Sequence, residues 1–314
     1  MSMKGKAGAM TDRITTVGVL HVGEMGAAVA AVLRSRGARV VTTVAGRSQR
    51  TAGRCREAGV EVLDSLADVV RVSDVVMSLV PPASAEQLVN EYCEHAHVAP
   101  AGAVYVEMNS IGPELCAILG EKVERAGCSF VDAAINGLAK NLTTSGTLFL
   151  SGPGSEQVAA LFGGAVRTRM LGEEIGRASA MKMLLAGVSK GVCALFVELG
   201  LAAQRREMLT EMLEASSQIY PGIMQLIDRM LPTYALHAPR RAMEMNELQE
   251  TLRAADLEPC VVDAVRRLHE SLAEESFDTP AEGNGWTVAS LIQHLQRRDF
   301  LAAEELASPK QTGK

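Results

Sequence analysis

A glycine-containing turn near the start of the chain has the residue types that bind phosphate. Residues 17–26 read V-G-V-L-H-V-G-E-M-G, and an alanine-rich helical pattern follows at once. A strand that turns directly into a helix presents backbone N–H groups and the positive end of the helix dipole. Gly23 would let the backbone approach a diphosphate, and Gly26 would let the helix pack closely on the strand. The alternative is an ordinary strand-to-helix turn, because His21 occupies the first position of the G-x-G-x-x-G pattern.

A second polar group follows the next predicted strand, residues 39–44. Where a dinucleotide-binding fold holds NAD, an Asp or Glu about 20 residues beyond the glycines binds the ribose 2′-hydroxyl. This chain has Arg47, Ser48 and Arg50 instead, and two guanidiniums with a hydroxyl suit a 2′-phosphate. We therefore expect NADP(H), and the alternative is a solvated basic loop. The residues expected to contact this cofactor are His21, Val22, Gly23, Glu24, Met25, Gly26, Arg47, Ser48, Arg50, Val80, Pro81 and Asn109.

Composition narrows the class of protein. The 314 residues suffice for about two domains, and 47% are hydrophobic, so a sizeable core can form. A net charge of −6 without a basic stripe argues against nucleic-acid binding, and no apolar run reaches the roughly 18 residues that a membrane span needs. The six cysteines lack a C-x-x-C pair, which disfavours a disulfide framework or a metal site and favours a reduced, cytoplasmic protein.

Strand and helix patterns alternate up to about residue 150, which indicates a doubly wound, mostly parallel sheet. From residue 178 onward no strand is expected. One long helix over residues 178–206 is rich in small and apolar residues, as in a helix buried on most sides, and shorter helices separated by prolines follow. We therefore predict an α/β Rossmann domain, a long interdomain helix and an all-α C-terminal domain. The predicted parts are a disordered leader (1–12), an NADP-binding domain (13–175), a helical domain (176–307) and a frayed tail (308–314).

Four segments together resemble the β-hydroxyacid dehydrogenases, which belong with 6-phosphogluconate dehydrogenase and the imine reductases. They are the glycine turn, the segment E-M-N-S-I-G-P at 107–113, the segment F-V-D-A-A-I-N-G at 130–137 followed by G-T-L at 146–148, and G-R-A-S-A-M-K at 176–182. The segments occur in the order found in that family and span most of residues 14–190. The C-terminal helices are similar to a little-studied subgroup of the family, more weakly.

The resemblance implies a role for each segment. Lys182 corresponds to the family's catalytic lysine, whose ammonium can donate a proton to a carbonyl oxygen during hydride transfer. Substrate binding is assigned to Asn109, Ser110, Asn136, Gly137 and Ser189. The partners implied are a small-molecule substrate and a second subunit, in a homodimer built through the C-terminal helices. The residues alone leave alternatives open, namely that Ser110 caps the helix at Pro113 and that Asn136 only forms an Asn-Gly turn. Asp132 is expected to hold a backbone or cap a helix rather than to act as a base.

The chain departs from the family pattern at three places. His21 replaces a turn glycine, Asn136-Gly137-Leu138 replaces Ser-Gly-Gly, and Ala186 stands where the family has Asn one turn after the lysine. Ser189 or Ser179 could hold a water near Lys182 instead. The leading hypothesis is an NADP(H)-dependent oxidoreductase acting on a small hydroxy acid or its keto form. The alternatives are imine reduction on the same scaffold, which retention of Lys182 disfavours, and a non-catalytic NADPH-binding regulatory protein.

Overall fold

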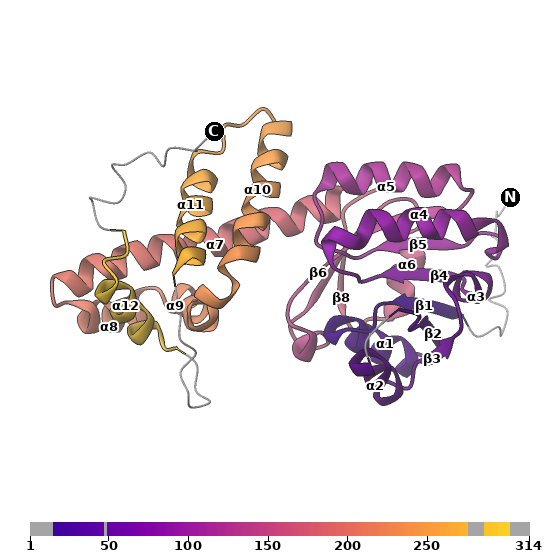
Figure 1. Cartoon of the computed structure of the whole chain (residues 1–314), viewed down its shortest axis with the longest axis horizontal. Coiled ribbons are helices and arrows are strands. Elements are labelled where there is room, and N and C mark those ends of the chain that lie inside the picture. The colour runs from indigo at the N-terminus through magenta and orange to yellow at the C-terminus, as the bar shows by residue number, and fades with distance from the viewer. Residues whose placement is uncertain (1–14, 47–48, 276–285, 302–314) are drawn as a thin grey trace, which may run out of the picture. The chain divides into compact units, whose positions relative to one another are not determined.

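The structure is a computed structural model, and it describes residues 15–46, 49–275 and 286–301. The predicted leader and tail, together with Arg47 and Ser48, lie outside the described residues. The chain divides into two compact units, Met1–Lys182 and Met183–Lys314. Both units are drawn in Figure 1.

The first unit is built on one sheet of eight strands in the order β3-β2-β1-β4-β5-β6-β7-β8. The strands are β1 (Thr16–Leu20), β2 (Arg39–Thr43), β3 (Glu61–Leu63), β4 (Val75–Ser78), β5 (Val104–Glu107), β6 (Ser129–Asn136), β7 (Thr147–Ser151) and β8 (Arg167–Met170). Only the β6–β7 pairing is antiparallel among these strands. The predicted doubly wound, mostly parallel Rossmann sheet is therefore confirmed.

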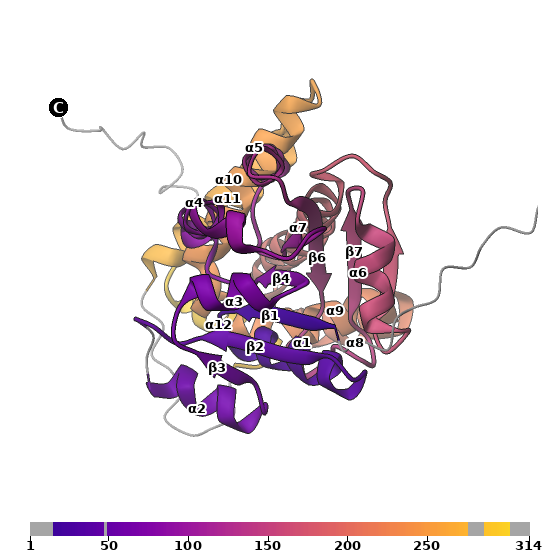
Figure 2. The same ribbon diagram turned by 90° about the vertical axis from the view of Figure 1, so that its right-hand side faces the viewer.

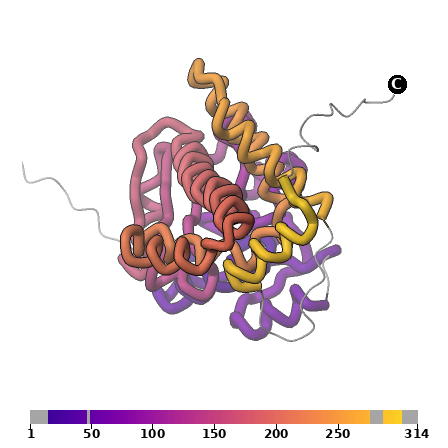
Figure 3. Tube along the Cα trace, turned by 90° about the vertical axis from the view of Figure 1, so that its left-hand side faces the viewer, coloured from indigo at the N-terminus to yellow at the C-terminus, as the bar shows by residue number. Residues whose placement is uncertain are grey.

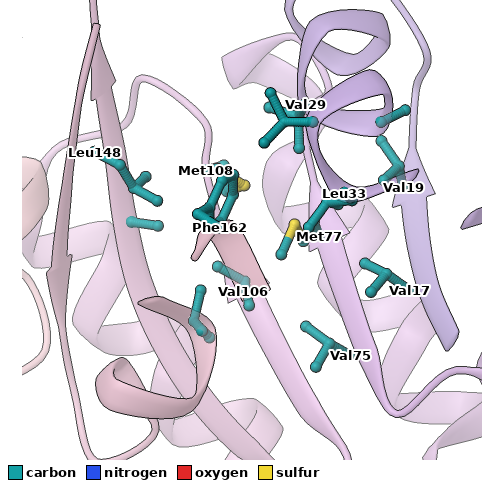
Figure 4. Packing of buried hydrophobic residues seen from close by; sticks show 14 of the residues in the cluster. Val17, Val19, Val29, Leu33, Val75, Met77, Val106, Met108, Leu148 and Phe162 are labelled. Atoms are coloured by element: carbon teal, nitrogen blue, oxygen red, sulfur yellow. The ribbon is translucent and has the colours of Figure 1, made fainter. Parts of the chain in front are cut away.

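Helices cover both faces of this sheet, as Figure 2 shows. They are α1 (Glu24–Ser35), α2 (Gln49–Glu57), α3 (Leu66–Val72), α4 (Ala85–His95), α5 (Pro113–Arg125) and α6 (Ser155–Phe162). One core lies under α1 and α6, where strand residues such as Val19, Met77 and Val106 meet Leu33 and Phe162 (Figure 4). The other lies under α3, α4 and α5. Strands buried on both faces explain the near-continuous apolar runs in the sequence.

Two elements of the first unit were not expected from the sequence. Helix α6 lies in a segment with glycines on both sides, and strand β8 reads R-T-R-M. This strand lies at the edge of the sheet and its residues are largely exposed. An edge strand of this kind has no apolar alternation by which the sequence could reveal it.

The second unit consists of helices packed along the C-terminal part of α7 (Arg177–Arg205). The others are α8 (Leu209–Ile219), α9 (Pro221–Met230), α10 (Ala238–Ala254), α11 (Cys260–Glu274) and α12 (Val288–Arg297). Figure 3 shows α10 and α11 side by side. Small residues on α7 allow this packing, because a Cβ at Gly187 would lie 2.4 Å from the Leu248 side chain. The predicted all-α region after a long helix is confirmed.

One side of α7 is less buried than its composition suggests. Leu184, Val188, Leu195 and Leu199 are exposed, and at 100° per residue they fall within one narrow stripe. A Cβ at Gly191, in the middle of that stripe, would meet nothing within 4 Å. By length and composition alone α7 could also cross a membrane, although its opposite side contributes to the core of the helical unit. The expectation of a helix buried on most sides is therefore met on one side only within a single chain.

Candidate functional site

The topology of the sheet gathers most of the predicted site residues of the first unit at one edge. In a parallel sheet of this type, ligands bind outside the carboxyl ends of the strands, where the strand order reverses. That reversal lies between the neighbouring strands β1 and β4. The glycine turn follows β1, Val80 and Pro81 follow β4, and Asn109 and Ser110 follow β5. Asn136 ends β6, so segments far apart in sequence meet at this edge.

The glycine turn keeps its form despite the histidine. His21 has a φ of 69°, in the left-handed region that glycine favours, and histidine enters that region more readily than most residues do. Its carbonyl accepts the Gly23 N–H at 2.9 Å. A Cβ at Gly26 would lie 2.4 Å from the same oxygen. Gly26 is therefore required for close packing of α1 on the turn, as the sequence pattern predicts.

The turn can accommodate a phosphate group. Gly23 is the N-cap of α1 and contributes no side-chain hydrogen bond to the first turn of the helix. The backbone donors of that turn thus remain available to an anion, with the helix dipole behind them. Val22 is buried in the core, Met25 is half-buried, and Glu24 is exposed and 3.4 Å from the Arg54 guanidinium. These features fit the diphosphate of a dinucleotide.

Of the three residues predicted to bind a 2′-phosphate, only Arg50 is described. It is exposed in the first turn of α2. Between the end of β2 and α2, the described residues include no acidic side chain. In the described part of that segment, no carboxylate lies beside Arg50 that would repel a phosphate.

Lys182 and Ser110 meet directly, although 72 residues separate them in sequence. The Lys182 ammonium donates a hydrogen bond to Ser110 Oγ at 2.6 Å. Lys182 comes from the second turn of α7, and Ser110 from the loop after β5. The N-cap of α5 is Gly112, without a side-chain hydrogen bond, so Ser110 does not cap that helix as the sequence alternative proposed. The pair places an ammonium and a hydroxyl at the carboxyl edge of the sheet.

Asp132 fixes the start of the helix that carries Lys182. Its Oδ2 accepts hydrogen bonds from the backbone N–H groups of Gly176, Ala178 and Ser179, at 2.9–3.1 Å. Its Oδ1 accepts the Ser179 hydroxyl at 2.7 Å. A carboxylate that accepts from several donors at a helix N-terminus anchors that helix strongly. Asp132 acts as a cap, as expected, and the Ser179 hydroxyl is committed to it.

Asn109 turns its carboxamide into the protein. It is buried, and its Nδ2 donates to Ser78 Oγ at 2.8 Å, which ties the β5 loop to the end of β4. Its Oδ1 is buried and has no hydrogen-bond partner among the described residues. That oxygen is thus an acceptor to which the described residues supply no donor.

Glu107 is a residue of this site that the sequence did not single out. It ends β5, is fully buried, and accepts the Asn109 backbone N–H through Oε1 at 2.7 Å. Burial raises the pKa of its carboxyl to about 8; the nearby Asp132 adds to this, whereas Asn109 and Lys182 oppose it. The available signal in the sequence was an acidic residue at the end of an otherwise apolar strand.

Of the remaining residues predicted to bind substrate, two lie at the end of strand β6, and one belongs to the second unit. Asn136 and Gly137 are exposed at the end of β6, and Gly137 has a φ of 139°. A Cβ at Gly137 would lie 3.0 Å from the Gly146 Cα, so this glycine allows the strand to turn there. Ser189 belongs to the second unit, and its hydroxyl donates to the Ala186 carbonyl of its own helix at 3.0 Å.

Models of known families match three parts of the chain. Residues 16–162 match the NAD-binding domain of 6-phosphogluconate dehydrogenase. Residues 203–272 match a domain of unknown function, DUF1932. Residues 259–314 match the N-terminal domain of mycothiol maleylpyruvate isomerase.

Two proteins of undetermined function resemble most of the chain. The solved structure of a conserved protein, MTH1747, which is described as similar to 3-hydroxyacid dehydrogenases, is 32% identical. It covers 82% of this chain and 96% of its own, with a TM-score of 0.68. An uncharacterized 28.5 kDa protein of Methanothermus fervidus is 24% identical over 82% of this chain and 99% of its own.

A third relative is a longer protein. The cytokine-like nuclear factor N-PAC of Aedes aegypti is 32% identical over 56% of this chain, but over only 34% of its own length. This chain thus corresponds to about a third of that protein.

More distant structures share the fold. A 3-hydroxyisobutyrate dehydrogenase of Mycobacterium tuberculosis, solved with L-serine, has a TM-score of 0.73 at 15% identity and covers 90% of this chain and 100% of its own. An imine reductase of Streptomyces aurantiacus has a TM-score of 0.56 at 18% identity, with coverages of 90% and 99%.

Proposed function

The chain belongs to the 6-phosphogluconate dehydrogenase-like superfamily, and on this premise we propose that it is an NADP(H)-dependent oxidoreductase of small hydroxy acids or their keto forms. The observation that carries the proposal is the hydrogen bond from Lys182 to Ser110, at the edge of the sheet where the glycine turn also lies. A nucleotide-binding turn and a positioned ammonium are the two protein components that hydride exchange with a carbonyl requires.

Lys182 has a defined task in this reaction. The nicotinamide, when bound, supplies or accepts the hydride. When a carbonyl is reduced, negative charge develops on its oxygen, and the Lys182 ammonium stabilises that charge and donates a proton. In the reverse direction the neutral amine accepts the proton of an alcohol. Ser110 holds the Nζ in place, and Asp132 holds the helix from which Lys182 projects.

Turnover by a Lys182→Met variant tests this role. The substrates are 3-hydroxy acids, the corresponding keto acids and cyclic imines, each with NADPH and NADH. We expect turnover of a hydroxy or keto acid that falls by about 10²–10⁴-fold in the variant, the usual contribution of a general acid–base group. Lys122→Met is the matched control, since Lys122 lies in the last turn of α5 and is paired with Glu86 of α4.

The other outcomes discriminate among the alternatives. Full turnover of a hydroxy acid by Lys182→Met would refute the proposed role of this lysine. If Lys182→Met still reduces imines at the wild-type rate, the chain would be assigned to the imine reductases. NADPH binding without turnover of any compound would favour the non-catalytic alternative.

Selectivity for NADP(H) is the second part of the proposal. The support is Arg50 beyond β2, with no described acidic side chain between β2 and α2. Loss of one hydrogen bond to a charged group costs about 1.5–3 kcal/mol, so Arg50→Ala should weaken NADPH binding about 10-fold or more and leave NADH binding unchanged. Fluorescence titration measures both affinities without a substrate. Arg71→Ala, which removes an exposed arginine of α3, is the control. Equal losses for both nucleotides would contradict the proposal.

We further propose a cytoplasmic homodimer that pairs the exposed stripe of α7 with a second copy. Four large apolar side chains on one line of a helix form a patch that a soluble monomer rarely exposes. Gly191, within this stripe, leaves room for the partner helix to approach closely. This stripe consists of Leu184, Val188, Gly191, Leu195 and Leu199.

A further inference from the structure

A row of four polar residues crosses the sheet beneath the candidate site. Ser78 of β4 pairs with Glu107 of β5, Glu107 with Asp132 of β6, and Asp132 with Ser151 of β7. Paired residues on neighbouring strands project to the same face of a sheet. All four are fully buried, in a row that otherwise borders the apolar core under α3, α4 and α5. Burying a polar side chain costs desolvation free energy, which hydrogen bonds to the buried group must offset.

Three members of the row are well supplied with partners. Ser78 accepts from Asn109, and Asp132 accepts from Ser151, from Ser179 and from the backbone at the start of α7. Glu107 is different, because only its Oε1 has a partner, the Asn109 backbone N–H. Its Oε2 is buried and has no hydrogen-bond partner in the part of the chain that the structure describes.

The surroundings of Glu107 stabilise its neutral and its ionised carboxyl to different extents. An ionised carboxylate has two oxygens that need donors, and leaving one of them bare in a buried site is costly. The neighbouring Asp132 carboxyl adds repulsion. In the opposite direction, the Asn109 N–H and the Lys182 ammonium favour the ionised form. Burial has the largest effect, and it raises the pKa of Glu107 to about 8, close to physiological pH.

We propose that Glu107 is a positioning residue for the chemistry of Lys182: by taking up or releasing a proton beneath the Asn109–Ser110 loop, it sets the charge that Lys182 carries. The inference rests on the proposed function of Lys182 as the acid–base group. Glu107 does not touch the substrate in this scheme. It acts through its electrostatic interaction with the lysine and through the loop that holds Ser110.

The groups around Glu107 define this coupling. Asp132 faces it from β6, Lys182 from α7 and Cys116 from α5, and Tyr105 lies on its own strand. Strand β4 contributes Ser78, which does not titrate. Burial raises the pKa of Cys116 and of Tyr105, so both remain neutral near pH 8. Glu107 is therefore the group facing Lys182 whose raised pKa, about 8, brings its titration into this range.

The two groups then titrate as a pair. An ionised Glu107 stabilises the Lys182 ammonium, which is the form that donates a proton when a carbonyl is reduced. A protonated Glu107 allows Lys182 to become neutral, which is the form that accepts a proton when an alcohol is oxidised. These two states of the pair hold the same number of protons, so Glu107 shifts the balance between the directions without a net change of charge.

The experiment is an NMR titration of Lys182 in the full-length protein with ¹³C at lysine Cε. The Lys182 signal is identified by its absence in Lys182→Met. In the wild type we expect two titration steps for this signal. Glu107→Gln keeps an acceptor for the Asn109 N–H but cannot ionise. In this variant we expect a single step for Lys182, at a pH about one unit lower than in the wild type, because the ammonium has lost one nearby negative charge.

Two further variants separate charge from structure. Glu107→Asp retains an ionisable group, and the second step should return. Glu114→Gln removes an exposed carboxylate at the start of α5, and the Lys182 titration should match the wild type. A wild type with a single step, or a folded Glu107→Gln with an unchanged titration, would overturn the proposal. If Glu107→Gln does not fold, the number of steps in the wild type decides alone.

This result is independent of turnover. If Lys182→Met keeps full activity while Lys182 titrates in two steps, the proposed function of the lysine fails and the coupling stands. If Lys182→Met is inactive and the Lys182 signal titrates identically in the wild type and in Glu107→Gln, the catalytic role of Lys182 stands and its coupling to Glu107 fails.

Discussion

At the scale of single residues, buried carboxyls at the ends of two neighbouring strands have opposite surroundings. Asp132 accepts hydrogen bonds with both oxygens, mostly from the start of α7. Glu107, its partner across the β5–β6 ladder, accepts the Asn109 backbone N–H through Oε1, while its Oε2 has no hydrogen-bond partner among the described residues. Two similar side chains thus serve different purposes because the backbone donors around them differ. Asp132 anchors a helix, whereas burial raises the pKa of Glu107 to about 8.

Glu107 should make stability depend on pH. Its pKa is raised from 4.5 to about 8 in the folded protein, so the folded state binds the proton more tightly than the unfolded state. The stabilisation from this group is complete below about pH 4.5 and is lost as pH rises through 8. Because a pKa difference of one is worth roughly 1.4 kcal/mol, the loss is on the order of a few kcal/mol. Denaturant unfolding from pH 5 to 9 measures it.

Glu107→Gln should remove this contribution, so that the alkaline fall in unfolding free energy becomes shallower than in the wild type. Glu114→Gln should leave the wild-type slope in place. A variant and a wild type whose unfolding free energies run parallel between pH 5 and 9 would contradict the assignment of that pH dependence to Glu107.

At the scale of elements, the strand–turn–helix motif of β1 and α1 depends on the absence of a side chain at one position. Gly26→Ala would place a Cβ 2.4 Å from the His21 carbonyl oxygen, a backbone atom that cannot move away alone. We expect the unfolding free energy to fall by about 1–3 kcal/mol, as in other overpacked sites, and NADPH binding to weaken as the turn shifts.

A matched helical glycine should respond with the opposite sign. A Cβ at Gly53 in α2 would meet only the end of the Arg56 side chain, at 3.9 Å. Gly53→Ala should therefore stabilise the protein by up to about 1 kcal/mol through helix propensity. Thermal or denaturant unfolding of the two variants tests both signs, and a Gly26→Ala protein as stable as the wild type would rule out the close approach.

The same elements show what the sequence can predict. Buried strands such as β4 and helices with strong periodicity were located correctly, since burial on both faces leaves a continuous apolar run. Strand β8 was missed because its pairing with β7 is made by backbone groups and leaves no apolar pattern in R-T-R-M. The meeting of Lys182 with Ser110 was implied only by the family resemblance. The partners of Glu107 required the strand register, which spacing along the chain does not give.

At the scale of the whole molecule, the exposed stripe of α7 predicts how copies associate. Replacing Val188 or Leu195 by Glu would place a charge in the proposed contact between two α7 helices, where desolvation makes it costly. Val188→Glu and Leu195→Glu should therefore convert a dimer into monomers in light scattering or sedimentation. Val261→Glu changes another exposed apolar residue, on α11, and should remain dimeric. A monomeric wild type at micromolar concentration would refute the contact.

Helix α7 has a consequence for how such proteins exchange parts over evolution. The contact boundary between the two units falls at Lys182, in the second turn of an unbroken helix. A gene cut at that boundary would end on the lysine itself, and the last carbonyls of the remaining helix would lose the N–H partners that residues 183–186 provide. A helical half joined at this boundary must therefore continue α7 as a helix, so that its own first four N–H groups pair with these carbonyls. In such an exchange Lys182 stays with the nucleotide-binding half, on a helix that the new half has to complete.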